Sequence, residues 1–204
     1  MHQFVNTHIM HNHYMQLTPR KNAIKHRLLY VQSGVILAKL GKKEFAVEAD
    51  QMLWLPFDCL YGLTILPNTQ FIDFQVSSRV QHALAHQAGY ITPSPLLLEL
   101  FKATSDENTT SEKQDLINRL ILLECSQSEP VLYDTSTSNI INQQLANLET
   151  TLTSSELRAA LVMRQAHKEM QSGIKEDTVV QRYYQGDHHS FQHMKNALLG
   201  DEHL

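Results

Sequence analysis

The 204-residue sequence is poor in cysteine and in long apolar runs, and these scarcities exclude whole classes of protein. The two cysteines, Cys59 and Cys125, lie far apart in the chain, which predicts free thiols rather than a disulfide. No apolar run reaches the ~18 residues of a membrane-spanning helix. The N-terminus also lacks the basic and then apolar layout of a signal peptide. We therefore expect a cytoplasmic protein with no membrane association.

Sequence motifs of enzymes are missing as well. The chain contains no G-x-G-x-x-G, no P-loop and no G-x-S-x-G. Cys59 would need a neighbouring base to act as a nucleophile, and the sequence indicates none. We therefore predict a protein that is not an enzyme and that uses no cofactor.

What the sequence does contain is a series of short apolar segments between Arg27 and Val76. Gly, Pro, Asn and Asp separate these segments, which predicts β-strands closed into a sandwich or barrel. With 42% hydrophobic and 19% charged residues, the chain can bury a packed core. The predicted strands are Leu28–Val31, Val35–Leu40, Glu44–Val47, Gln51–Leu55, Tyr61–Leu66 and Phe71–Val76.

Helical patterns follow the predicted barrel, so the expected fold class is α+β. We divide the chain into a barrel over residues 1–92, a helical linker or dimerisation region over 93–135, and a helical region over 136–204. The predicted helices are Ser78–Gln87, Leu96–Ala103, Ser111–Cys125, Asn139–Leu148 and His188–Leu199. The third of these helices has four apolar residues at near-helical spacing, namely Leu116, Leu120, Ile121 and Leu123.

The helical region also carries local start and stop signals. Thr153 and Glu156 fit a capping box, T-x-x-E, at the start of a helix that is expected to stop at Gly173. Asp187 is placed to cap the last helix, whose apolar stripe includes Phe191. These signals predict two helices joined by a tight polar turn.

Two helices joined in this way are compatible with a helix-turn-helix, whose second helix enters the major groove of DNA. The outward positions of the last helix suit contacts with base edges and phosphates, and the predicted DNA-binding residues are His188, His189, Gln192, Lys195 and Asn196. An ordinary helical hairpin with a solvated face is the alternative. Residues 151–204 contain 6 Lys and Arg against 7 Asp and Glu, which is not the strong positive charge of a typical phosphate-binding domain.

The segment Tyr30–Leu63 resembles the cupin-like sensory domain of AraC/XylS-type transcription regulators. In it, Glu48-Ala49-Asp50 stands where that family usually has a P-G-D turn, and Leu53–Asp58 stands for the strand that ends in proline-rich residues. Leu152–Met163 and Phe191–Gly200 resemble parts of the family's helix-turn-helix region, which is shortened here. The resemblance implies a double-stranded β-helix barrel that senses a small-molecule effector, helices that contact DNA, and a homodimer.

Aromatic side chains of the barrel are the candidates for an effector pocket. Trp54, Tyr61 and Phe57 are predicted to line a mostly apolar pocket, although filling of the barrel core is the alternative. Metal-dependent cupins use histidines on inner strands, but no histidine occurs between His26 and His82, so no barrel metal site is predicted. The alternative function is a small metal-free cupin-like binding or interaction protein without DNA-binding activity.

Two groups of histidines outside the barrel segment also have spacings that metals can use. His8, His11 and His13 lie near the N-terminus, and His189 and His193 are four residues apart on the last predicted helix. We interpret the first group as an exposed arm and the second as surface or DNA-contact side chains. No metal is therefore predicted for either group.

Overall fold

Two antiparallel β-sheets and a set of helices make up the fold of this computed structural model, which describes residues 4–105, 109–146 and 155–200. The strands are β1 Val5–Asn12, β2 Gln16–Leu17, β3 Lys21–Asn22, β4 Lys25–Ser33, β5 Val35–Leu40, β6 Lys43–Glu48, β7 Met52–Leu55, β8 Leu60–Ile65, β9 Thr69–Ser77 and β10 Gly89–Ile91. The helices are α1 Pro95–Thr104, α2 Ser111–Ser126, α3 Ser136–Ala146, α4 Ser155–Gln171, α5 Glu176–Tyr184 and α6 His188–Leu199.

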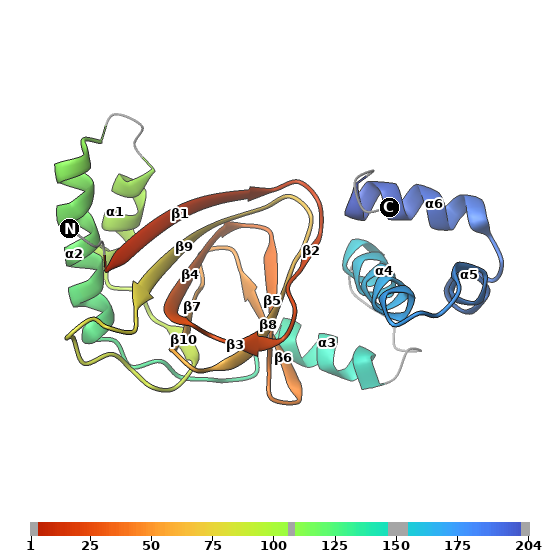
Figure 1. Cartoon of the computed structure of the whole chain (residues 1–204), viewed down its shortest axis with the longest axis horizontal. Helices are drawn as coiled ribbons and strands as arrows, with labels where there is room; N and C mark the ends of the chain where they lie inside the picture. Colours follow the sequence, from red (N-terminus) through yellow and green to blue (C-terminus); the bar gives the residue numbers. More distant parts are fainter. Residues whose placement is uncertain (1–3, 106–108, 147–154, 201–204) are drawn as a thin grey trace.

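The sheets face one another as a barrel-like sandwich. One sheet has the strand order β1-β9-β4-β7-β10 and the other has the order β2-β8-β5-β6, with β3 paired to β8. Figure 1 shows α1 and α2 at one end of this sandwich and α4, α5 and α6 at the other. The predicted α+β class, a β-barrel followed by helices, is confirmed.

All six predicted strands are present, and Val35–Leu40 coincides with β5. His8, His11 and His13 are exposed as expected, but they do not lie on a free arm, because His8 and His11 belong to β1 and His13 follows it directly. This strand pairs along its length with β9, from Val5 opposite Val76 to Asn12 opposite Thr69. As an edge strand with exposed histidines it lacks a clear apolar alternation, which is the signal that the sequence analysis relied on.

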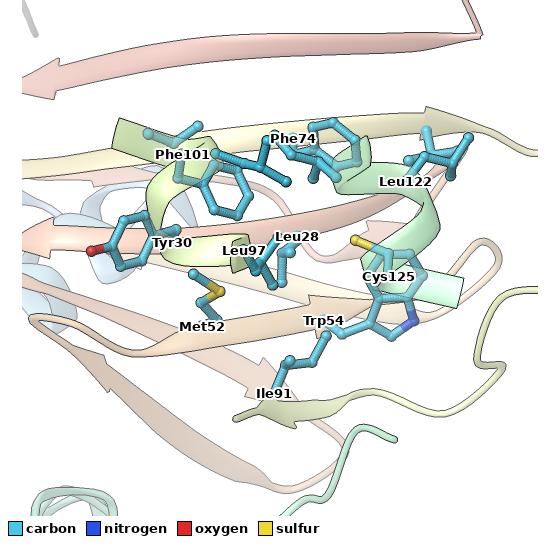
Figure 2. Close-up of a cluster of buried hydrophobic side chains, with 14 of the residues drawn as sticks. Leu28, Tyr30, Met52, Trp54, Phe74, Ile91, Leu97, Phe101, Leu122 and Cys125 are labelled. Atoms are coloured by element: carbon cyan, nitrogen blue, oxygen red, sulfur yellow. The ribbon is translucent and has the colours of Figure 1, made fainter. Parts of the chain in front are cut away.

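The outer face of the first sheet is covered by α1 and α2. Figure 2 shows Trp54 and Phe74 from the strands packed with Phe101 and Cys125 from the helices. The four apolar positions named above for α2 do not share one environment, since Ile121 is buried whereas the three leucines are exposed. Both sides of α2 are apolar at helical spacing, so the pattern alone did not decide which side packs; the exposed residues are Leu116, Leu120 and Leu123.

The predicted helix at Ser78–Gln87 does not form, and this segment crosses the barrel without regular structure. Tertiary contacts fix it instead. Leu84 is buried in the same cluster as Trp54, and the indole N–H of Trp54 donates to the carbonyl of Ala85 at 2.9 Å. These contacts outweigh the weak helical pattern of a segment this short.

The interior between the two sheets is filled by apolar side chains from both of them. Leu29 and Leu53 from one sheet pack with Ile36, Phe45 and Leu63 from the other. Each of these five side chains is at most 5% exposed. The barrel interior is therefore a core, packed as small barrels generally are.

Helix α3 covers the open edge of the second sheet. The side chain of Ser138 accepts a hydrogen bond from the backbone N–H of Ala46, and Asn142 both accepts from the N–H of Glu44 and donates to its carbonyl. Residues four apart on a helix share a face, so one side of α3 satisfies two edge residues of β6. This connection fixes the start of the helical region on the barrel.

Helices α4, α5 and α6 enclose a small core of their own. Met163, Val179, Val180 and Phe191 are fully buried in it, and Met15 from the barrel joins them. The predicted stop at Gly173 is confirmed by its positive φ of 92°. Asp187 caps α6 as predicted, accepting from the N–H of Ser190 at 3.0 Å. The capping box is not tested, because Thr153 lies outside the described residues.

A candidate ligand cleft between the barrel and the helices

The structure does not bring the three predicted pocket residues together. Trp54 is 1% exposed and points into the cluster under α1 and α2, where it stacks on His26 with ring centroids 5.5 Å apart. Tyr61 is buried on the opposite side, in the barrel interior. Phe57 lies in a turn and is exposed. The cavities described below are lined by other residues.

Tyr61 belongs to a polar group inside the barrel. Its hydroxyl accepts a hydrogen bond from Arg27 at 2.6 Å, and Arg27 also makes two hydrogen bonds to the carboxylate of Asp73, at 2.9 and 2.8 Å. Burial alone would lower the pKa of Arg27, but the hydrogen bonds and the charge of Asp73 raise that pKa above its usual value. These groups satisfy one another, so the interior offers no free polar group at this place.

A cleft of about 840 Å³ lies between the second sheet and α4. One wall is the chain that leads into β3, another is the outer face of β5, β6 and β8, and the third is one side of α4. Its charged and apolar lining residues are Met15, Leu17, Arg20, Lys39, Glu44, Leu63, Leu145, Arg164, Lys168 and Leu199. Any molecule bound there would contact both the barrel and the helical region.

Positive charge dominates this cleft. Arg20, Lys39, Arg164 and Lys168 line it, and among the lining residues that the structure describes Glu44 is the only one with a carboxylate. Glu44 is engaged by Arg164 at 2.6 Å, in a pair whose side chains are only 5% and 3% exposed. In the described part of the chain, neither Arg20 nor Lys168 makes an ion pair.

The electrostatic environment acts on Lys168 in particular. Desolvation within the cleft lowers its pKa below the ordinary value of 10.5, and the nearby charges of Arg164 and Lys39 lower it further, while Glu44 acts in the opposite direction. The protonated amine is therefore disfavoured without an added anion. An anionic group placed in the cleft would relieve this cost.

A second cavity of about 560 Å³ lies farther toward the N-terminal end of α4. Its charged lining residues are both acidic, Glu48 and Glu156, and its walls include Val35, Leu157 and Leu198. The buried contact of Leu37, Ala46, Ile141 and Leu161 lies on the same face of the sheet. The two cavities thus have opposite charge.

The predicted DNA-binding residues lie on α6, and four of the five are exposed: His188, His189, Gln192 and Asn196. The expected outward position of Lys195 was wrong, because its side chain folds back over the ring of Phe191 and is buried. Its amine lies 3.6 Å from one carboxylate oxygen of Glu176, and the other oxygen of Glu176 accepts a hydrogen bond from Gln192 at 2.9 Å.

The sequence analysis missed the cleft residues. Arg20, Lys39 and Arg164 stand in unrelated segments and form no motif, and only the packing of α4 on the second sheet brings them together. The one available signal was Lys39 on a predicted strand, facing Glu44 across a predicted hairpin. A charged pair on a face that also carries Leu37 and Ala46 indicates a covered face.

Two further observations concern metals and membranes. Among the described residues, no three His, Cys, Asp or Glu side chains are grouped so that they could hold a metal ion. Within the same residues, no helix combines the length and the apolar character needed to cross a membrane.

Comparisons with known proteins gave structural similarities only. No protein-family model matches the sequence. No curated protein matches it either. Similar solved structures include ToxT from Vibrio cholerae, with 9% identity over 96% of this chain and 94% of that chain at a TM-score of 0.38. A second ToxT structure, the K231A variant, has 8% identity over 97% and 94% of the two chains at a TM-score of 0.40.

Other solved structures are similar to a smaller share of the chain. A cupin superfamily protein from Desulfitobacterium hafniense has 6% identity, over 38% of this chain and 72% of that chain, with a TM-score of 0.35. Identities and TM-scores of this size are low, and the function proposed below rests on the residues of this chain.

Proposed function

We propose that this protein is a ligand-responsive transcription regulator of the AraC type. The observation that carries this proposal is the cleft, because its walls come from both the barrel and α4. A ligand that contacts both parts favours the arrangement in which both contacts are made, and it thereby shifts the population of domain arrangements. Through α4, such a shift reaches the helices that are proposed to contact DNA.

The lining of the cleft defines the chemical class of the effector. Arg20 and Lys168 offer positive charge without an ion-pair partner in the described residues, while Leu17 and Leu145 provide apolar wall. We therefore propose a small anionic molecule with an apolar part. The filled barrel interior supports this location, since the core leaves the expected cupin pocket occupied by side chains.

The helical region supplies the proposed DNA contacts. Helices α5 and α6 are joined by a three-residue turn in which Gln185 has a left-handed conformation, with φ of 55°. Exposed side chains of α6, including Gln192 and Asn196, suit hydrogen bonds to adenine in the major groove. We propose α6 as the helix that meets the DNA.

A homodimer is the third part of the proposal. Leu116, Leu120 and Leu123 are 55%, 44% and 45% exposed and follow one side of α2 at helical spacing. A stripe of this kind can pack against the same stripe of a second copy across a twofold axis. In Figure 1, α2 lies at the end of the barrel away from α4–α6, so a dimer formed there leaves the helical region free.

The test is binding of the purified protein to labelled genomic DNA fragments at low and at moderate salt. A regulator retains a few fragments selectively, and its affinity falls steeply as salt rises. Replacing Gln192 and Asn196 with Ala removes this retention, whereas Gln143→Ala, an equally exposed amide on α3, leaves it unchanged. An apolar anion such as anilinonaphthalene sulfonate then changes the retention in the wild-type protein but not in Lys168→Ala.

A binding protein without DNA activity is the second candidate, and one contact favours it. Glu176 takes up both Gln192 and Lys195, so part of the proposed DNA face is neutralised within the molecule. If no fragment is retained at low salt while the anion still binds in the cleft, this second function replaces the first.

A further inference from the structure

We infer that Glu44 competes with the effector for Arg164. In the free protein Glu44 pairs with Arg164, and when the anionic group of the effector binds Arg164, Glu44 pairs with Lys39 instead. This inference rests on the proposed ligand cleft and deepens it, because it names the residues that set affinity and specificity there. Three observations carry it: the burial of the Glu44–Arg164 pair, its position in the cleft wall, and the strand register that places Lys39 beside Glu44.

The ion pair holds the helical region on the barrel. Glu44 lies on β6 and Arg164 on α4, and the same guanidinium also lies 3.2 Å from the hydroxyl of Thr64 on β8. Both charged side chains are almost fully buried. A buried charge that loses its only partner is strongly destabilising, so a ligand can take Arg164 only if Glu44 finds another partner.

Lys39 is that partner. It stands directly opposite Glu44 in the register of β5 and β6, on the same face of the sheet. The Cβ atoms of such cross-strand pairs are about 5 Å apart, which is within reach of a Lys–Glu contact. At present the amine of Lys39 donates to the backbone carbonyl of Lys42 at 2.9 Å, at the exposed end of the hairpin. A change of side-chain rotamer therefore suffices to move it onto Glu44.

The exchange has a defined charge balance. Before binding, Glu44 neutralises Arg164, and Lys39 is held by a neutral carbonyl. After binding, the anion of the ligand neutralises Arg164, and Glu44 neutralises Lys39. Neither Arg164 nor Glu44 is left without a counter-charge, and the attachment of α4 to β6 through this pair is replaced by one that runs through the ligand.

Specificity follows from the same competition. A neutral apolar molecule cannot displace Glu44, because it would leave Arg164 without a counter-charge. A cationic molecule is repelled by Arg20 and Lys168, which line the same cleft. Only a ligand that brings its own negative group is accepted, and its affinity is reduced by the cost of displacing Glu44.

The experiment is a fluorescence titration of the full chain with anilinonaphthalene sulfonate, an apolar anion that stays ionised. Glu44→Gln should bind it at least about tenfold more tightly, because the competing charge is gone while the shape remains. Glu48→Gln is the matched control on the same strand, outside this cleft, and leaves the affinity unchanged. Lys39→Met should weaken binding in the wild type by several-fold and have no effect in the Glu44→Gln background.

The outcomes separate the inference from the proposed function. If Lys168→Ala weakens binding but Glu44→Gln does not strengthen it, the cleft stands and the competitor role of Glu44 is wrong. If neither Lys168→Ala nor Arg20→Ala changes binding, the anion does not use the cleft and both proposals fail. Should Glu44→Gln unfold, which thermal unfolding would reveal, the Lys39→Met titration decides alone: unchanged affinity then overturns the exchange.

Discussion

The barrel interior and the cleft beside it differ in how far their charged side chains are balanced by partners. In the interior, Arg27, Asp73 and Tyr61 satisfy one another. In the cleft, one carboxylate, that of Glu44, faces four cationic side chains. Polar groups that are mutually satisfied stabilise a structure, whereas an excess of one charge around a cavity invites a ligand of the other charge. This difference is why we propose the ligand site in the cleft and not in the barrel interior.

The largest effect is expected from breaking the interior network. Asp73→Ala leaves Arg27 without its counter-charge in a largely buried place and should lower the free energy of unfolding by about 3–5 kcal/mol. Urea denaturation followed by tryptophan fluorescence measures this, since Trp54 is the single tryptophan. Replacing the pair together, Arg27→Met with Asp73→Leu, should recover most of the loss. A loss below about 1 kcal/mol for Asp73→Ala would show that the network is not satisfied as described.

The next effect concerns the pH dependence of the cleft. Because the pKa of Lys168 is lowered in the folded protein, its protonated amine destabilises the fold at pH values below that pKa, and this cost disappears as pH rises from there toward the ordinary value of 10.5. Binding of an anion requires the protonated amine, so affinity for anilinonaphthalene sulfonate should fall roughly tenfold as pH rises toward 10.5, the ordinary value for lysine. In Lys168→Arg the guanidinium stays charged, and the fall should vanish. An identical fall in both proteins would assign the pH dependence to another group.

The barrel could be predicted from the sequence, whereas the cleft could not. Strand-length apolar runs such as Val35–Leu40 predicted the strands of the barrel, because apolar runs and the turn residues between them are local signals. Trp54 was predicted to line a pocket, but its side chain packs against α1 and α2. The local sequence of the strand does not indicate which of its two faces these helices cover in the folded chain. Arg164 and Glu44 are 120 residues apart, so no local pattern connects them. Long-range packing, and not residue chemistry, limited the prediction of the site.

A smaller effect is expected at the proposed DNA face. There the carboxylate of Glu176 accepts a hydrogen bond from Gln192 and forms an ion pair with Lys195. Glu176→Gln removes one negative charge while keeping an amide that can bond to Gln192. It should raise DNA affinity several-fold at low salt and increase its salt dependence, since Lys195 becomes available to phosphate. Glu129→Gln, an exposed acid outside the helical region, controls for net charge alone. Equal effects of both variants would indicate a general charge effect instead of release of Lys195.

The smallest effect is expected at Phe57, which was predicted to line a pocket but lies away from the cleft. Phe57 is 48% exposed in a turn, so Phe57→Ala should change the free energy of unfolding by no more than about 0.5 kcal/mol and leave anion binding unaltered. Trp54→Ala, in contrast, empties a buried site and should cost about 3–5 kcal/mol, again without a specific loss of binding in the protein that remains folded. Thermal unfolding monitored by circular dichroism compares the two. If Phe57→Ala abolished anion binding at unchanged stability, the ligand site would lie at the barrel turn, and the contrast between a closed interior and a charged outer cleft would no longer hold.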